Sequence, residues 1–214
     1  MTRPCCRSAA TTRWPREAAL TVELLGVDAV APIHWGAFPI LAGTPAAQEW
    51  HRGAYRGVPL PVPYYAGEIR DSDPTYPELF GYEVSVGTAP GMPSANVPAA
   101  LARFEAGLRA VVARMDGVIA VGARPTTVTD LYAILEIAAI AHGEWVHIHP
   151  HANGNGPMAR LWVNWVAVRY GLPFVLALKP RPTNLICAAA AAASMRGDHR
   201  SMVVSLLTLL NQHI

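Results

Sequence analysis

A short polar stretch, His147 to Arg160, has the residue types and the spacing that phosphate chemistry needs. Within it, Gly154 and Gly156 flank Asn155 immediately before a predicted helix. Two glycines let the backbone turn tightly with its amide groups pointing inward, and the positive end of the helix adds to the attraction for anions. We therefore expect a phosphate-binding turn at these residues.

Two side chains beside this turn could act on a bound phosphate donor. His149 lies just before the turn, where its imidazole could take a proton from an incoming hydroxyl. Arg160 lies one turn into the helix, close enough for a forked pair with phosphate oxygens. Each feature alone is often structural, so the prediction depends on their order within one short stretch.

Several histidines near the turn raise a second interpretation, a transition-metal site: His142, His147, His149 and His151. Alternating histidines would lie on one side of the chain only if the backbone were extended, and Pro150 and the flanking helices oppose that conformation. Metal sites usually draw carboxylates as well, and Glu144 is the only acid close by. A metal-dependent enzyme is therefore the less favoured interpretation.

Apolar residues at helical spacing predict a bundle of helices around the turn. One apolar stripe consists of Leu101, Phe104, Leu108, Val111 and Met115. Thr127 and Asp130 resemble a capping box that opens an apolar helix leading into the polar stretch. The next helix should begin near Pro157, and its apolar residues on nearly every side place it in the middle of a bundle. Shorter helices are expected over 45–51, over about 183–194, and from Asp198 to the C-terminus.

The segment from about residue 53 to 98 is different, because it holds many of the chain's 19 prolines. Long helices cannot run through such spacing. Val58–Tyr65 and Tyr82–Thr88 are expected to be short strands, so that this surface insertion carries a small hairpin. Residues 1–16 are expected to be a flexible leader and 17–214 a single domain.

Composition limits the function classes. The 214 residues are 52% hydrophobic and 15% charged, which fits a globular domain with a sizeable core. The net charge of +2 comes without a basic cluster, which argues against nucleic acid as a partner. The 3 cysteines, of which Cys5 and Cys6 are adjacent, argue against a disulfide scaffold. With no secretory signal and no apolar run of about 20 residues, we expect a cytoplasmic protein without a membrane span.

The polar stretch resembles the motif of the Fic family. That motif runs His-Pro-Phe, two variable positions, Gly-Asn-Gly-Arg, two more, then Arg; here it reads His149-Pro150-His151-Ala152-Asn153-Gly154-Asn155-Gly156-Pro157-Met158-Ala159-Arg160. Gly53-Ala54-Tyr55-Arg56 is similar to the G-x-Y-R segment that precedes the family's flap hairpin. The resemblance covers roughly residues 35–195. It implies a mainly α fold, a Fic-type helical bundle with a small β-hairpin flap.

The resemblance also implies a nucleotidyltransferase, most often one that moves AMP from ATP with Mg²⁺ to a protein hydroxyl. His149 would be the general base. Asn155 and the amides of Gly154 and Gly156 would hold the donor phosphates, and Arg160 would contact the terminal phosphate. Asn153 would be a weak Mg²⁺ ligand, because the family has an acid there and an amide carbonyl lacks its charge. The acceptor, a protein or a small molecule with a hydroxyl, would bind along the flap.

Two further departures from the motif keep alternatives open. Pro157 replaces an arginine and has no amide hydrogen, and His151 replaces a packed phenylalanine with a polar ring that needs a partner. One alternative is a catalytically degenerate Fic fold that binds a nucleotide or a partner. Another is a repurposed fold acting on a small molecule. The family's inhibitory-helix pattern has no match in the chain, which leaves room for a separate inhibitory partner.

Two questions stay open at this level. Glu136 in the helix before the motif either pairs inside the bundle or lies on an exposed face. The apolar face of the last helix either packs internally or forms a dimer, and it consists of Val203, Leu206, Leu207 and Leu210.

Overall fold

The computed structural model describes residues 43–86, 89–172, 176–177 and 185–211. The predicted leader and both N-terminal cysteines lie outside these ranges. Within them the fold is mainly helical, as predicted. The α-helices are α2 (Thr44–Ala54), α3 (Val97–Asp116), α4 (Val128–Ile148), α5 (Asn155–Arg169), α6 (Leu185–Ser194) and α7 (Arg200–Leu210). Short 3₁₀ helices, η3 (Pro63–Tyr65) and η4 (Ser94–Asn96), and one hairpin of β1 (Ser85–Val86) and β2 (Ala89–Pro90) complete the order.

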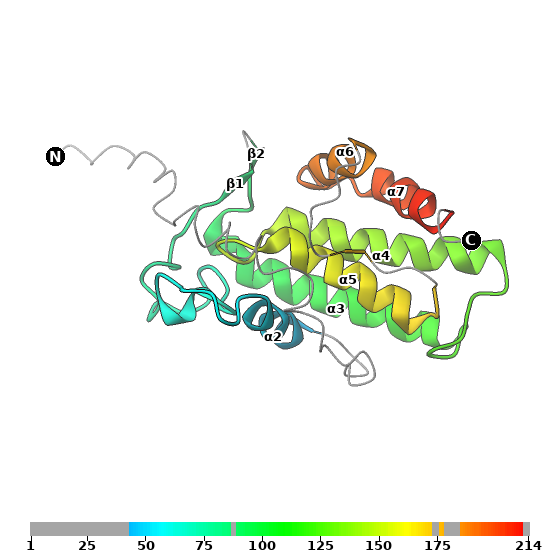
Figure 1. The fold of residues 1–214 in the computed structure, drawn as a ribbon, viewed down its shortest axis with the longest axis horizontal. Coiled ribbons are helices and arrows are strands. Elements are labelled where there is room, and N and C mark those ends of the chain that lie inside the picture. The colour runs from blue at the N-terminus through cyan, green and yellow to red at the C-terminus, as the bar shows by residue number, and fades with distance from the viewer. Residues whose placement is uncertain (1–42, 87–88, 173–175, 178–184, 212–214) are drawn as a thin grey trace.

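Three long helices, α3, α4 and α5, run side by side along the molecule (Figure 1). α2 packs against α5, and α6 and α7 pack against α4. Nearly every residue of α5 from Met158 to Ala167 is buried, so this helix occupies the middle of the bundle as its apolar sequence predicted. The hairpin lies at the end of the bundle where α4 leads into α5 (Figure 1).

The start of α4 is capped as predicted. The Thr127 hydroxyl oxygen accepts a hydrogen bond from the backbone N–H of Asp130 at 3.1 Å, which satisfies one of the helix's orphan donors. The apolar stripe of α4 then packs into the core, with Ile134, Ala138 and Trp145 each fully buried. α4 is thereby held rigidly up to the residue where the polar stretch begins.

Aromatic side chains from four helices meet at Trp162 of α5. Its ring contacts Trp50 of α2 at a centroid distance of 5.0 Å, Phe104 of α3 at 5.4 Å and Trp145 of α4 at 5.7 Å. Tilted and edge-to-face pairs of this kind add to the large apolar area that each ring buries. This cluster fixes the helices on both sides of the α4–α5 loop relative to one another.

The strand predicted over Val58–Tyr65 is wrong. These residues form a loop that ends in η3, because Pro59, Pro61 and Pro63 have no N–H to donate to a ladder. Of the other predicted strand, Tyr82–Thr88, only Ser85–Val86 pairs, and its antiparallel partner is Ala89–Pro90. The predicted small hairpin is therefore present, at the second of the two positions.

The helix boundaries differ from the prediction by a few residues. α5 starts at Asn155, so Pro157 lies within its first turn. α7 starts at Arg200, whose N–H donates to the Asp198 carboxylate at 3.1 Å. Val203, Leu206 and Leu210 of α7 pack inside the molecule, while Leu207 is exposed.

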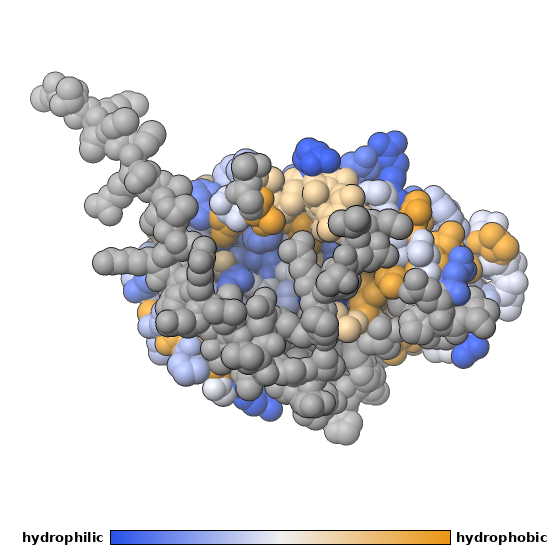
Figure 2. Space-filling model, turned by 45° about the horizontal axis from the view of Figure 1, so that its top comes forward, coloured by the Kyte–Doolittle hydropathy of each residue, from blue (hydrophilic) through white to orange (hydrophobic). Residues whose placement is uncertain are grey.

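The outer surface of the bundle carries small apolar side chains over α6. The pale orange area in Figure 2 lies over this helix, whose alanine run leaves Ala188, Ala189 and Ala192 exposed. In the described part of the chain, no helix is both long and apolar enough to cross a membrane.

Candidate active site

The loop between α4 and α5 begins with a left-handed residue. α4 ends at Ile148, and its C-cap His149 has φ 53° and ψ 57°. Among the described non-glycine residues only Asp71 shares a positive φ. This conformation costs about 1–3 kcal/mol for a non-glycine residue and is found preferentially at functional sites. The strained position is thus the one predicted to carry the base.

The His149 imidazole is held in one tautomer. Its Nδ1 lies 3.1 Å from the Val146 carbonyl oxygen, and a carbonyl only accepts, so Nδ1 carries the proton and Nε2 keeps its lone pair. Burial lowers the pKa of His149 to about 4; the Val146 carbonyl opposes this shift and the charge of Arg70 adds to it. The ring is therefore neutral near pH 7, which is the form that can accept a proton.

Gly154 makes the turn into α5 possible. It is the N-cap of the helix, with φ 75° and ψ 5°, a conformation that favours glycine. A Cβ at this position would lie 2.9 Å from His51 Nε2 and 3.2 Å from the Tyr55 hydroxyl. Both the backbone angle and the available space therefore require glycine here.

Asn155 fastens the loop with its side chain. The buried Oδ1 accepts from the His151 N–H at 3.0 Å, and Nδ2 donates to the His151 carbonyl at 2.8 Å. Any contact of Asn155 with a phosphate would then use its backbone amide, which belongs to the first turn of α5 and has no partner within the helix.

The remaining predicted residues lie around the same helix start. The Asn153 Oδ1 accepts from the Gly154 N–H at 2.7 Å, so the oxygen proposed for Mg²⁺ is already engaged. Arg160 is buried, and a Cβ on Gly156 would lie 3.6 Å from its Nη1. The Arg160 guanidinium thus lies beside the first turn of α5, where the fold brings all the predicted site residues together.

His151 meets the need for a partner only in part. Its fully buried ring stacks on His51 of α2 at a centroid distance of 3.9 Å and an interplanar angle of 15°. Its Nδ1–H donates to the Glu68 carbonyl at 2.9 Å, while its Nε2 is buried without a hydrogen-bond partner among the described residues. Burial lowers the pKa of His151 well below its ordinary value.

His51 was not predicted as part of the site. Its Nδ1 accepts from the Gly67 N–H at 2.8 Å, and its Nε2–H donates to the Asn153 carbonyl at 3.0 Å. Burial lowers its pKa to about 4, so it too is neutral near pH 7. Tyr55, from the predicted G-x-Y-R segment at the end of α2, packs beside it with a ring distance of 4.7 Å. Together these side chains at the end of α2 pack against the α4–α5 loop.

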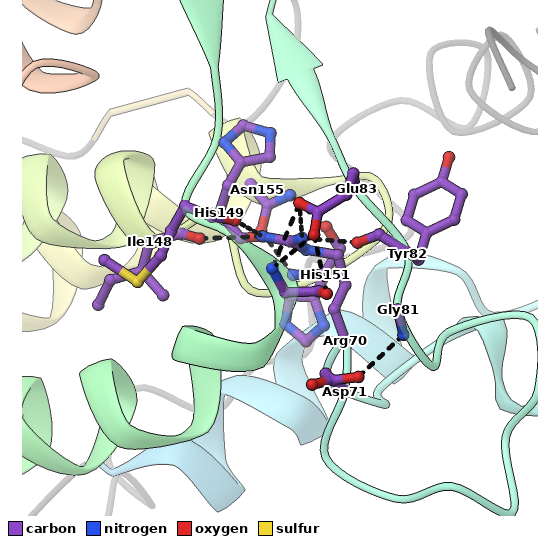
Figure 3. Close-up of polar contacts among 11 residues, drawn as sticks. Arg70, Asp71, Gly81, Tyr82, Glu83, Ile148, His149, His151 and Asn155 are labelled. Carbon is purple, nitrogen blue, oxygen red and sulfur yellow. Dashed lines mark hydrogen bonds and ion pairs between the residues drawn. The ribbon is translucent and has the colours of Figure 1, made fainter. Parts of the chain in front are cut away.

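Arg70 is the second residue that the motif did not reveal. Its guanidinium is fully buried and donates to four backbone carbonyls, those of His149 (2.9 Å), Ile148 (3.2 Å), Tyr82 (2.7 Å) and Met92 (3.1 Å), as Figure 3 shows in part. Its backbone N–H donates to the Pro150 carbonyl at 2.9 Å. The sequence does hold one signal, because Arg70 is the only basic residue between Arg56 and Arg103.

The histidines in and just before the polar stretch are not arranged as a metal site. His142 is buried in α4, and His147 Nδ1 lies 3.0 Å from the Met195 carbonyl oxygen. In the described part of the chain, no three His, Cys, Asp or Glu side chains are placed to hold a metal ion. Glu136 lies on an exposed face of α4.

Comparison with known proteins agrees with this geometry. Residues 45–167, more than half of the chain, match the Fic/DOC family, and the chain belongs to that family.

Solved structures share the fold at low sequence identity. BepC, a VirB-translocated effector protein of Bartonella tribocorum crystallised with AMPPNP, is 13% identical with a TM-score of 0.62, covering 97% of this chain and 94% of its own. A Fic domain-containing signaling protein of Bacteroides thetaiotaomicron is 18% identical with a TM-score of 0.57, covering 92% and 69%. Fic-1 of C. elegans is 23% identical with a TM-score of 0.57, covering 90% and 48%.

One curated protein matches over a short segment only. A metal-dependent hydrolase of Korarchaeum cryptofilum is 48% identical over 44 residues, which are 21% of this chain and 19% of the hydrolase. Because so little of either chain is covered, the match assigns neither fold nor activity.

Proposed function

We propose that the protein transfers a nucleotidyl group, AMP from ATP in the first instance, to a hydroxyl. Two observations carry the proposal: His149, the C-cap of α4, holds a neutral imidazole with an unprotonated Nε2, and the loop that follows it ends at the N-terminus of α5, where the buried Arg160 lies beside the first turn. Membership of the Fic family supports a transferase of this kind.

The reaction follows from the charges around the loop. The acceptor hydroxyl gives its proton to Nε2 of His149 while its oxygen attacks the α-phosphorus of the donor. The bond from that phosphorus to the bridging oxygen breaks, and pyrophosphate leaves with the electron pair. The amides at the start of α5 and the Arg160 guanidinium stabilise the negative charge that develops on the phosphate oxygens.

The residues present fit Mg²⁺ poorly. Asn153 offers a neutral oxygen that already accepts from the Gly154 N–H, and the described residues bring no carboxylate cluster to the loop. We therefore expect ATP binding to depend only weakly on Mg²⁺, with the ion held mainly by the phosphates of the donor.

The hairpin offers a surface for the acceptor. β1 and β2 pair only with each other among the described residues, so each has a free edge that could hold an extended segment through backbone hydrogen bonds. We propose that the acceptor hydroxyl reaches His149 from this side.

One observation favours a second candidate, a nucleotide-binding protein that transfers slowly or not at all. Pro157 lies within the first turn of α5, where it removes one amide donor and stands in place of an arginine. In this case Pro157→Arg should create or raise transfer, whereas an already active transferase should change little.

Calorimetric titration tests the donor site directly. ATP, CTP, GTP and UTP are titrated into the wild type, Arg160→Ala and Arg109→Ala, with and without Mg²⁺. Arg109 is the matched control, because it is an exposed arginine on α3 that pairs with Glu105. We expect one nucleotide to bind, and Arg160→Ala alone to weaken it about tenfold or more. Absence of binding by a folded wild type, or equal affinity in both variants, contradicts the proposal.

A further inference from the structure

We call the residues that lead into β1 and those that follow β2 the two arms of the hairpin. The arms are joined at their base by the buried Arg70 cation. The Arg70 guanidinium donates to Tyr82 on the first arm and to Met92 on the second, at 2.7 and 3.1 Å. Between these contacts and the strands, the Gly91 N–H donates to the Val84 carbonyl at 2.9 Å. At the base of the hairpin, one side chain that belongs to neither arm therefore holds the two arms together.

Glu83 reinforces the same junction from the outside. Its carboxylate accepts from the N–H and the hydroxyl of Ser94, both at 3.0 Å, and lies 3.9 Å from Arg70 Nη1. The Glu83 side chain is 59% exposed, while that of Arg70 is fully buried. The Glu83 carboxylate and the four backbone carbonyls together offset the burial of the Arg70 charge.

The same guanidinium also holds the catalytic loop. It donates to Ile148 and His149, the carbonyls at the C-terminal end of α4, where a cation is favoured by the helix dipole. A Cβ on Gly91 would lie only 3.5 Å from the His149 Cβ, so the second arm passes directly over the proposed base. Figure 3 shows Arg70 between the loop and the hairpin.

We propose that Arg70 is a positioning residue, which fixes the flap hairpin and His149 in one register so that an acceptor held by the flap meets the imidazole. This inference rests on the proposed transferase function. An apolar side chain could hold two loops together without burying a charge. A guanidinium instead directs several N–H groups in fixed directions at once, which orients both segments. Lysine has the charge without the planar fork and cannot reproduce the four contacts.

The test compares Arg70→Lys with Arg169→Lys in the full chain. Arg169 is the matched control, because it is also buried and pairs with Asp116 at the opposite end of α5. Two readouts follow geometry: hydrogen exchange at the Gly91 amide, and the ¹³C chemical shift of the His149 Cα, which reports its left-handed backbone. Two follow function: KM for ATP, and kcat for pyrophosphate release from ATP, in which water or the hydroxyl groups of the protein itself accept the AMP.

In Arg70→Lys we expect Gly91 exchange to rise about tenfold or more. We expect the His149 shift to move and kcat to fall about 100-fold, with KM for ATP within about threefold of the wild type. Arg169→Lys should leave all four readouts near the wild type, even if its melting temperature falls as far as that of Arg70→Lys. Unchanged exchange and shift in Arg70→Lys, or equal changes in Arg169→Lys, overturn the inference.

Two safeguards keep the outcomes separate. If the wild type does not turn over ATP, the proposed function fails, and the exchange and shift measurements still decide the role of Arg70. If Arg70→Lys does not fold, Glu83→Gln replaces it, because this exposed side chain supports the same junction. Gly91 exchange should then rise about threefold or more, and no rise overturns the inference.

Discussion

At the scale of single residues, the site depends on histidines that are neutral when folded. His149 has to be neutral to accept a proton, and its Nδ1–H contact with Val146 leaves Nε2 as the acceptor. The proposed base, with a pKa near 4, is weak but fully available from about pH 6 upward. The rate should therefore be insensitive to pH between about 6 and 8.

The neutral rings of His51 and His151 make the free energy of unfolding depend on pH. Burial lowers the pKa of both rings below the ordinary 6.5, so below pH 6.5 the folded state binds fewer protons than the unfolded state. The contribution of each neutral ring to the unfolding free energy is complete above pH 6.5. It is lost as the pH falls from there toward the folded-state values.

Replacing His151 with phenylalanine should remove one of these contributions. His151→Phe is expected to reduce the slope of unfolding free energy against pH, between pH 6 and 5, by about 1.4 kcal/mol per pH unit. Urea unfolding at half-unit pH steps measures the slope. Tyr132→Phe, which changes an exposed ring on α4, should keep the wild-type slope. Parallel curves for wild type and His151→Phe would show that the ring is not held neutral by burial.

At the scale of elements, the α4–α5 loop needs glycine for two separate reasons that can be measured apart. Gly57 and Gly154 have similar angles, φ 79° and 75°, but a Cβ on Gly57 meets nothing within 4 Å. Gly57→Ala should therefore cost only the backbone term, about 1–2 kcal/mol of unfolding free energy.

Gly154→Ala should cost more, because the methyl group also meets His51 and Tyr55. Gly154→Ala should also displace the start of α5 and weaken ATP binding. Gly57→Ala should do neither. Urea midpoints and calorimetric titration give the two quantities. Equal costs for the two variants, with unchanged ATP affinity, would mean that the loop tolerates the methyl group and does not form the donor site.

The elements also show what the sequence can predict. The long helices follow from periodicity and from the Thr127 cap, because those signals act within a few residues of each other. The strand expected at Val58–Tyr65 fails because its prolines have no N–H groups to donate to a neighbouring strand, and these missing donors decide the structure.

At the scale of the whole molecule, the residues that sequence reasoning missed act across long separations. Arg70 reaches His149 across 79 positions, and His51 reaches Asn153 across 102. No local pattern encodes these contacts, since they exist only once α2, the flap and the loop are assembled. The order of His149, Gly154 and Arg160 could be recognised because the turn and the helix start that carry it are contiguous in sequence.

The central claim is that His149 serves as the base in transfer from ATP, and the most direct test compares pyrophosphate release by the wild type and His149→Ala. Both are measured at saturating ATP, between pH 6 and 8, with water or the hydroxyl groups of the protein itself accepting the AMP, and ATP affinity is determined separately. We predict a rate in the wild type that is independent of pH, and a loss of about 100-fold or more in the variant with ATP affinity unchanged. Equal rates in the two proteins would contradict the account, and so would a wild type that binds ATP but releases no pyrophosphate.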